Sequence, residues 1–389
     1  MLWLNFFHLY QPVNTDGHII KDATVKSYLR IIRAMEEHPD SHFTFNITGG
    51  LFLRWQELGY KDIPVRLKKL IDCGRLEITG TAAYHPILPL IPEEEAKNQI
   101  KTNEKILKEY LGKDFKPKGF FLPEMAYSPK ISILIKKLGY KWLILDDFSA
   151  RPKPKDFDLN KIYTDKASGI KIIFRSRNLS NSFVPATIIE MSKNDDSEKT
   201  IAITATDAEL YGLRHEDQTG IFEASLSNKN IHTSTFSEFI ERQKPAGKID
   251  LIKSTWETDE KDLKNNTPYP LWFNSKNDIQ MKLWELADFS YKIVKKHKND
   301  PNYFWAYWHL IRGFASCTFW WASKKDFRKV FGPISWNPDE IERGTNELIR
   351  AVRSLDSTTT RSDKIKAEKL YIKIKQMVWQ KHWTYYWKK

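Results

Sequence analysis

The stretch Gly119 to Tyr127, GFFLPEMAY, decides how the rest of the chain is interpreted. Gly119 to Leu122 form an apolar run that predicts a buried strand, and Pro123 ends it. Glu124 follows directly. In barrels and open sheets of parallel strands, catalytic groups lie past the carboxyl ends of strands, where a rigid strand holds them at an open edge. Glu124 is therefore a candidate catalytic carboxylate.

A second stretch, Thr204 to His215 (TATDAELYGLRH), repeats this arrangement. Residues 201–204 predict a strand, and Asp207 and Glu209 follow it. A single Glu after a strand can be a solvated residue that only stabilises a helix N-terminus. Two strand ends that both carry carboxylates favour a site in which paired acids perform chemistry.

Strands of the same kind recur along the first two thirds of the chain, separated by helical patterns. We predict strands at 2–7, 43–47, 75–79, 119–122, 141–145, 171–174, 201–204 and 248–252, the last of these closing the barrel. This alternation of strands and helices is what a parallel sheet, closed or half-closed by crossover helices, requires. Residues 151–169, rich in Pro, Lys and Asp, are predicted to be an insertion.

Polar side chains also accompany other predicted strands. His8 and Gln11 follow the first strand, and both carry groups that can hydrogen-bond the hydroxyls of a polar ligand. Glu77 lies inside the third strand, where a carboxylate is costly if it points inward unpaired and ordinary if it points outward; both orientations stay open. Further candidates at or beyond strand ends are His85, Arg175 and Trp256.

From about residue 278 the patterns indicate helices only, at 278–297, 302–323, 337–354 and 364–380. We predict two domains: a barrel over 1–275 and an α-helical domain over 276–389 that packs on the barrel and completes its cleft. Aromatic residues at helical spacing belong more often to a core than to a ligand platform. Trp320 and Trp321 are adjacent and cannot share one helix face, so one of them is a candidate for the cleft.

The amino-acid composition limits which classes of protein the chain can belong to. With 389 residues, of which 41% are hydrophobic, the chain can bury a sizeable core and is not disordered. The net charge of +13 would suit a nucleic-acid binder, but no RRM, KH, zinc-finger or P-loop signature accompanies the lysines. We expect no specific nucleic-acid partner. The 14 Trp and 16 Tyr favour a stacking surface for sugars or bases.

The sequence also bears on location. No apolar run approaches the length of a membrane span, and the apolar start at 1–7 is too short for a signal peptide. The two cysteines form neither a disulfide framework nor a metal pattern. We expect a soluble cytoplasmic protein without a membrane partner; nothing in the sequence indicates its oligomeric state.

Four motifs together resemble the signature regions of glycoside hydrolase family 57: His8–Pro12 (HLYQP), Gly74–Gly80 (GRLEITG), Phe121–Tyr127 (FLPEMAY) and Asp207–Gly212 (DAELYG). That family contains α-amylases, 4-α-glucanotransferases, amylopullulanases and branching enzymes. The resemblance implies an α/β fold with an incomplete (β/α)7 barrel followed by a C-terminal helical domain. Tyr10 is a difference, because the family usually has a second His before Gln-Pro. The sequence also ends after the helices, without the β-rich C-terminal domain of several starch-acting members.

The resemblance implies a role for each candidate. Glu124 would be the nucleophile and Asp207 the general acid/base of a retaining glycoside hydrolase or transglycosylase acting on α-linked glucans or oligosaccharides. The remaining substrate-site candidates are His8, Gln11, Glu77, His85, Arg175, Glu209, Trp256 and Trp321. We expect a neighbouring carboxylate, Glu124 or Glu209, to raise the pKa of Asp207, and His8 or Arg175 to keep Glu124 charged.

A retaining mechanism needs its two carboxyl groups about 5 to 5.5 Å apart and requires no metal or cofactor. Two alternatives stay open. One is a metal-dependent polysaccharide deacetylase, although Pro39 separates His38 and His42, the His pair at helical spacing. The other is a non-catalytic carbohydrate-binding protein on the same fold, because a fold does not by itself confer activity.

Overall fold

The computed structural model describes residues 1–194, 200–323 and 335–386, which form two compact units. Unit 1 comprises Met1–Ala83 and Pro92–Trp256; unit 2 comprises Tyr84–Ile91 and the chain from Glu257 onward. The predicted division into domains 1–275 and 276–389, and the packing of one on the other, stay predictions.

Unit 1 is built on a ring of parallel strands. Among the described residues, neighbouring strands follow the order β1, β2, β3, β4, β5, β7, β8 and back to β1. These strands are β1 (Leu2–Leu9), β2 (Phe43–Ile47), β3 (Leu76–Thr79), β4 (Gly119–Phe121), β5 (Trp142–Asp146), β7 (Lys171–Arg175) and β8 (Ile201–Asp207). The predicted α/β class with parallel sheets is confirmed.

Two joints of the ring lack regular ladders. At one of them, the Gly80 N–H donates to the Gly119 carbonyl (2.9 Å) and the Phe121 N–H donates to the Gly80 carbonyl (2.9 Å), which connects β3 to β4. At the other, the Ser176 N–H beyond β7 donates to the Ile203 carbonyl of β8 (2.8 Å). The ring is thus two sheets joined edge to edge, as an incomplete barrel requires.

The strand predicted at 248–252 does not close the barrel, so this prediction was wrong. β10 (Lys248–Ile249) pairs with β6 (Tyr163–Asp165), which runs antiparallel to the first residues of β7. β6 comes from the segment predicted to be an insertion, and it occupies the edge of β7 that a last barrel strand would have needed. β9 (His232–Thr233) adds a short parallel pairing to the start of β1.

The interior of the ring is filled by alternate strand residues, because successive side chains point to opposite faces. Leu4 and Phe6 of β1 belong to one buried cluster with Phe121, Ile144, Ile173, Ile203 and Ala205, and α10 contributes Phe236, Phe239 and Ile240. Burying each such side chain contributes about 1.5–3 kcal/mol. The next inward positions, His8 on β1 and Asp207 on β8, are paired in register at the carboxyl ends of these strands.

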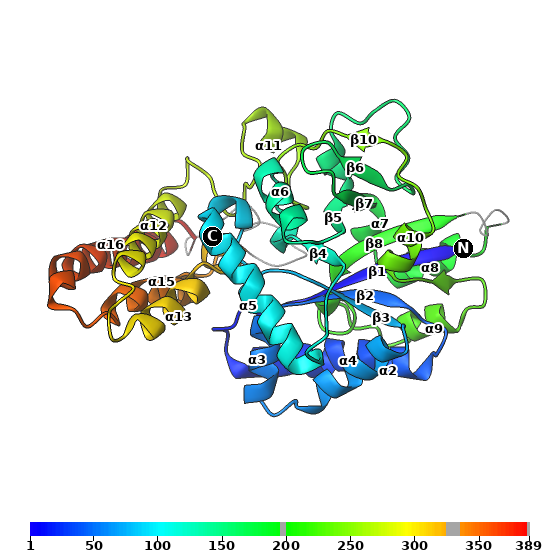
Figure 1. Cartoon of the computed structure of the whole chain (residues 1–389), viewed down its shortest axis with the longest axis horizontal. Helices are drawn as coiled ribbons and strands as arrows, with labels where there is room; N and C mark the ends of the chain where they lie inside the picture. The colour runs from blue at the N-terminus through cyan, green and yellow to red at the C-terminus, as the bar shows by residue number, and fades with distance from the viewer. Residues whose placement is uncertain (195–199, 324–334, 387–389) are drawn as a thin grey trace. The chain divides into compact units, whose positions relative to one another are not determined.

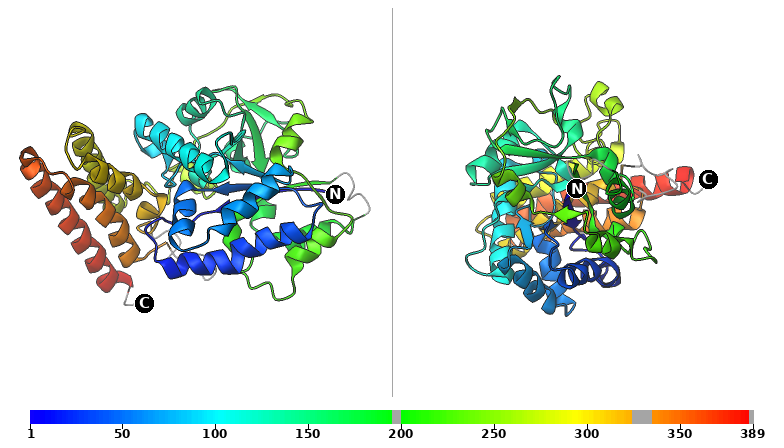
Figure 2. Two further views of the ribbon diagram at one scale, coloured as in Figure 1. Left: turned by 60° about the horizontal axis from the view of Figure 1, so that its bottom comes forward. Right: turned by 90° about the vertical axis from the view of Figure 1, so that its right-hand side faces the viewer.

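Helices cover the outside of the strands. In unit 1 they are α1 (Gly17–Ala23), α2 (Leu29–Glu37), α3 (Gly49–Glu57), α4 (Asp62–Asp72), α5 (Glu93–Leu111), α6 (Pro129–Lys137), α7 (Arg177–Ser180), α8 (Val184–Met191), α9 (Ile221–Ser227) and α10 (Phe236–Glu241). α4 packs on β3 and α5 packs across α3 and α4 (Figures 1 and 2). α5 begins with three glutamates, which stabilise the positive end of the helix dipole.

Unit 2 is helical: α11 (Glu260–Lys264), α12 (Asp278–Lys296), α13 (Tyr303–Gly313), α14 (Ser316–Trp320), α15 (Pro338–Arg353) and α16 (Arg361–Lys381). α12, α13, α15 and α16 pack side by side in a bundle (Figure 1). The single helix predicted over 302–323 is wrong, because the chain breaks between α13 and α14. There Ala315 forms a bridge with Pro86, and the Ser316 N–H donates to the His85 carbonyl (2.9 Å).

Within the described ranges, no helix combines the length and the apolar composition that a membrane crossing would need.

Candidate active site

The carboxyl end of the unit 1 ring is polar, in contrast to its apolar interior. A buried row begins at His8, whose Nδ1 lies 2.8 Å from Asn46 Oδ1, and continues as Asn46 Nδ2 donates to Thr79 Oγ1 (3.2 Å). On other strands of the same ring, Arg175 Nε donates to Asp146 Oδ2 (2.7 Å). Strand register therefore brings polar side chains from distant parts of the chain to one end of the ring.

Glu124 lies in a short turn after β4 with an unusual backbone. Its φ is +59° and that of Met125 is +49°, a left-handed conformation that costs about 1–2 kcal/mol per non-glycine residue. The turn is held by a neighbouring segment: the Trp256 N–H donates to the Glu124 carbonyl (3.2 Å), and the Tyr127 N–H donates to the Ser254 carbonyl (2.9 Å). Such strain persists where the surroundings fix it, and it is concentrated at functional sites.

The carboxylate of Glu124 accepts a hydrogen bond from the Trp256 indole, with 2.9 Å between Nε1 and Oε2. Trp256 is held in turn by Arg175, whose guanidinium lies 5.1 Å from the centre of the indole ring. Arg175 is buried and donates to Asp146 and to the carbonyl of Ala205 (2.8 Å). The polar contacts of Arg175 thus support Trp256 and the strands, and the expectation that His8 or Arg175 keeps Glu124 charged stays a prediction.

Asp207 ends β8 and forms an ion pair with Arg214, with 3.1 Å between Oδ2 and Nη1. Its side chain is 28% exposed, so it can reach a ligand. The chain turns back after Asp207, because the Arg214 N–H donates to the Glu209 carbonyl (2.8 Å) and Gly212 has a φ of +118°. This turn brings Arg214 close to Asp207 at the end of β8.

Glu209 is buried beside Asp207. Its Oε1 accepts hydrogen bonds from Gln11 Nε2 (2.8 Å) and from the hydroxyl of Tyr28. Burial, and then the charge of Asp207, raise the pKa of Glu209 to about 7. Glu209 therefore exchanges a proton near neutral pH, close enough to feel the charge of the residue predicted to be the general acid/base.

His8 lies near the residues that carry and hold the two acidic groups. It is paired in register with Asp207, and its ring centre lies 4.7 Å from that of Phe121 and 5.9 Å from that of Trp256. Burial lowers the pKa of His8, while the charge of Asp207 opposes this shift. Hence an uncharged imidazole lies between the strand end that carries Asp207 and the indole that binds Glu124.

The family of the chain can now be established. The sequence pattern of glycosyl hydrolase family 57 matches residues 4–252, which is more than half of the chain and includes Glu124 and Asp207. The chain belongs to glycosyl hydrolase family 57. This confirms the resemblance that the four motifs predicted.

Proteins with similar sequences carry different names. A 4-alpha-glucanotransferase from Thermococcus litoralis is 27% identical over 273 residues, which cover 65% of this chain and 40% of that protein. An alpha-amylase from Pyrococcus abyssi is 25% identical over 272 residues, which cover 65% of this chain and 41% of that protein. The chain thus spans about two fifths of the length of these relatives.

Solved structures agree with the family 57 fold. The crystal structure of the Thermococcus litoralis 4-alpha-glucanotransferase aligns with a TM-score of 0.71 at 20% identity, covering 92% of this chain and 60% of that one. At this identity the likeness shows the shared fold, a parallel α/β unit followed by helices.

Glu77, although part of a family 57 motif, lies elsewhere in the ring. It is near the amino-terminal end of β3, where its carboxylate accepts hydrogen bonds from the Ser237 N–H (3.0 Å), the Ser237 hydroxyl and Thr44 Oγ1 (3.2 Å). Burial raises the pKa of Glu77. The expectation that it contacts the cleaved sugar is therefore corrected: its contacts fix the start of α10 against β2 and β3.

His85 and Trp321, two other candidates, belong to unit 2. His85 is fully buried with a φ of +56°, and its Nδ1 lies 3.0 Å from Ser316 Oγ. Trp321 follows α14 and lies 4.3 Å from Trp320 between ring centres. Their predicted roles in substrate binding stay predictions.

The structure adds two residues that sequence reasoning missed, Arg214 and Tyr28. Arg214 lies in the stretch Thr204 to His215, seven positions after Asp207, but its contact with Asp207 depends on the turn at Gly212. Tyr28 lies in the π-helical segment Thr24–Tyr28, 181 positions from Glu209, so the sequence offered no signal for the pair.

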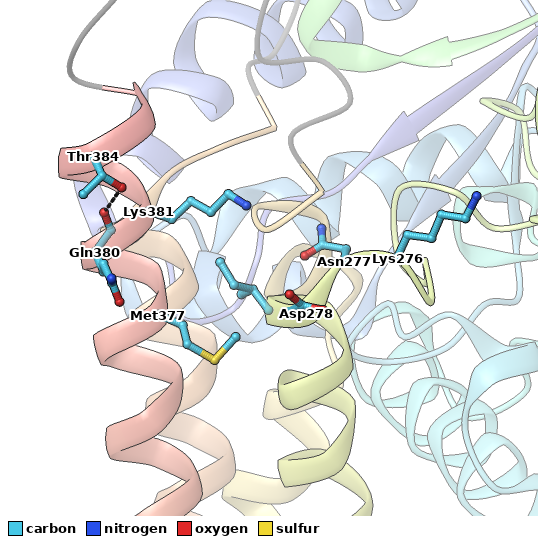
Figure 3. Close-up of a pocket in the computed structure, with 8 residues that line it drawn as sticks. Lys276, Asn277, Asp278, Met377, Gln380, Lys381 and Thr384 are labelled. Atoms are coloured by element: carbon cyan, nitrogen blue, oxygen red, sulfur yellow. Dashed lines mark hydrogen bonds between the residues drawn. The ribbon is translucent and has the colours of Figure 1, made fainter.

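Unit 2 has a pocket of its own, with a volume of about 390 Å³, between the first turn of α12 and the end of α16 (Figure 3). It is lined by Lys276, Asn277, Asp278, Ile279, Met377, Gln380, Lys381 and Thr384. No candidate residue from the sequence lines it. In the part of the chain that the structure describes, no group of three or more His, Cys, Asp or Glu is arranged to hold a metal ion.

Proposed function

We propose that this chain is a retaining glycoside hydrolase or transglycosylase that acts on α-linked glucans through a covalent glycosyl-enzyme, with Glu124 as nucleophile and Asp207 as general acid/base. The observation that carries the proposal is the convergence at one end of the ring: His8 pairs with Asp207 and packs near Trp256, which binds Glu124. The names of the relatives, an alpha-amylase and a 4-alpha-glucanotransferase, support the substrate class.

In the first step, a carboxylate oxygen of Glu124 attacks the anomeric carbon while the bond to the leaving oxygen breaks. Asp207 donates its proton to that oxygen, so the sugar on the leaving side departs as an alcohol. Charge develops on the anomeric carbon in an oxocarbenium-like transition state, which the negative carboxylate beneath it stabilises. The glycosyl residue is then esterified to Glu124, and Asp207 is ionised.

In the second step, Asp207 takes a proton from an incoming hydroxyl group, whose oxygen attacks the anomeric carbon and releases Glu124 as a carboxylate. Water as the acceptor gives hydrolysis, and the hydroxyl of a second glucan gives transfer. Both outcomes retain the anomeric configuration, because the configuration is inverted twice.

Glu124 and Asp207 have different surroundings. The Trp256 indole donates to Oε2 of Glu124, which favours the ionised form that a nucleophile needs. Asp207 forms an ion pair with Arg214 and lies close to the buried carboxyl group of Glu209, and its partly exposed side chain can reach the leaving oxygen of a bound sugar. Gln11 and His8 line the same end and carry groups suited to sugar hydroxyls.

Two variants test the assignment on maltooligosaccharides, with products separated by size. Glu124→Gln removes the nucleophile and should lower kcat by a factor on the order of 10⁴ or more. Asp207→Asn removes the general acid and should lower kcat by about 10²–10⁴. Exposed Glu109→Gln on α5 is the matched control and should retain parental rates. Shorter products alone indicate hydrolysis, and longer products indicate transfer.

The same assay addresses the two alternatives. Near-parental turnover in Glu124→Gln would overturn the proposal. Release of acetate from an acetylated glycan, abolished by EDTA and restored by a divalent cation, would identify a deacetylase instead. Saturable maltooligosaccharide binding without any turnover by the parent would identify a carbohydrate-binding protein.

A further inference from the structure

A pocket of unit 1 lies at the amino-terminal end of the ring strands. It has a volume of about 360 Å³, and four lysines line it: Lys118, Lys136, Lys141 and Lys171. Lys118 and Lys141 immediately precede β4 and β5, Lys171 opens β7, and Lys136 comes from the last turn of α6. Glu124 follows the opposite, carboxyl end of β4 and Asp207 is the last residue of β8, so this pocket is separate from the candidate active site.

The backbone holds three of these lysines side by side. The Lys141 N–H donates to the Lys118 carbonyl (2.8 Å), and the Lys171 N–H donates to the Lys141 carbonyl (3.3 Å). Neighbouring strands are about 4.8 Å apart, and like charges on adjacent strands destabilise a sheet. Lys118 and Lys141 directly precede the paired residues Gly119 and Trp142, so their like charges are adjacent, and Lys171 lies one position further along, in register with Trp142. An anion at this edge would offset the repulsion between these lysines.

Carboxylates of the chain neutralise only part of this charge. Lys118 forms an ion pair with Glu241, 2.6 Å between Nζ and Oε1. Within residues 1–194, 200–323 and 335–386, no carboxylate lies within the 4.0 Å of an ion pair from Lys136, Lys141 or Lys171. Hence the pocket has three uncompensated positive charges on a chain whose net charge is already +13.

The lining of the pocket also suggests what kind of anion fits. Apolar side chains, among them Ile240 and Pro245, lie beside the lysines. Lysine is a compact positive charge on a flexible stem and binds phosphate without a fixed geometry. We propose that this pocket binds a small molecule that carries a doubly charged phosphate group. The phosphate engages Lys136, Lys141 and Lys171, and the rest of the molecule lies against the apolar side.

Titration calorimetry on the full chain at low salt tests this proposal, with glucose 6-phosphate, inorganic phosphate and glucose as probes. We expect glucose 6-phosphate to saturate one site with a Kd of about 1 mM or tighter, and glucose not to bind there. Lys136→Gln, Lys141→Gln and Lys171→Gln combined should weaken phosphate-dependent binding by at least about tenfold. Tighter binding of the ester than of inorganic phosphate identifies an organic phosphate, and equal binding identifies phosphate itself.

The control removes the same charge elsewhere in unit 1. Lys97, Lys101 and Lys105 are exposed on α5 and line neither this pocket nor the candidate active site; changing all three to Gln should leave the Kd unaltered. An equal loss in this control, or affinity that increases with the length of any polyanion, would indicate general charge attraction and overturn the proposal. Absence of saturable binding by the parent would overturn it too. Circular dichroism shows whether the triple pocket variant folds. If it does not, the single variant Lys136→Gln, at an exposed helix end, replaces it, and calorimetry should still show weaker binding of glucose 6-phosphate than the parent.

Discussion

The indole nitrogen of Trp256 donates a 2.9 Å hydrogen bond to Oε2 of Glu124, and the backbone N–H of Trp256 donates to the carbonyl of the same glutamate at 3.2 Å. One residue therefore holds both the side chain and the strained backbone of the proposed nucleophile. Although Glu124 and Trp256 are 132 positions apart, the bridge between Tyr127 and Ser254 aligns their segments.

We predict that Trp256→Phe reduces kcat while keeping the aromatic contacts with His8 and Arg175. A hydrogen bond to a charged group contributes about 1.5–3 kcal/mol, so kcat should fall by about 10- to 150-fold. Steady-state kinetics on maltooligosaccharides measures the effect. Trp305→Phe is the control, because that side chain is 54% exposed in unit 2. A parental kcat in Trp256→Phe would contradict the assigned role of the indole.

The raised pKa of Glu209 predicts a pH-dependent contribution to stability. The side chain titrates near its ordinary value of 4.5 when unfolded and at about 7 when folded. Its contribution is therefore fully present below about pH 4.5 and is lost as the pH rises through about 7, by an amount on the order of 3 kcal/mol. Glu209→Gln removes this dependence, because the amide does not ionise.

Urea unfolding of the parent and of Glu209→Gln at pH 5 and pH 7.5 measures this difference. The midpoint of the parent should fall relative to that of the variant between the two pH values. The exposed Glu109→Gln variant serves as the reference, and its midpoint should follow the parent at both. A constant offset between parent and Glu209→Gln would show that Glu209 does not titrate in this interval.

Arg175 is predicted to act by positioning Trp256 and anchoring β7. Arg175→Lys retains the charge but cannot serve Asp146 and the Ala205 carbonyl together, which leaves buried polar atoms without partners. We expect a loss of about 2–4 kcal/mol of stability, seen as a lower Tm, with kcat reduced and KM nearly unchanged. Arg66→Lys is the matched control, because its bidentate pair with Glu36 is partly exposed and should contribute at most about 1 kcal/mol. An equal drop in Tm in both variants would exclude a special role for Arg175.

Some strands and site residues could be predicted from the sequence, and others could not. The strand predicted at 43–47 matches β2 because short apolar runs must be buried. The same logic placed Glu124 and Asp207 just past β4 and at the end of β8. It left both orientations of Glu77 open, because the direction in which a strand residue points, and the end of the ring at which it lies, depend on how the strands are paired. It missed Arg214 for a related reason, since its contact with Asp207 depends on a turn that the motif does not specify.

Gly119, the first residue of the stretch Gly119 to Tyr127, packs closely against the neighbouring strand. A Cβ added at Gly119 would lie 2.1 Å from the ring of Trp142, which is buried on the adjacent strand β5. Gly119→Ala must therefore displace a fixed indole or the backbone of β4, and overpacking of this kind costs about 1–3 kcal/mol. We expect a lower Tm and, because β4 carries the turn of Glu124, a reduced kcat. At Gly247 an added Cβ meets nothing within 4 Å, so Gly247→Ala should be close to neutral in both measurements. A Gly119→Ala protein with parental Tm and kcat would show that β4 accommodates the methyl group and does not depend on this close approach.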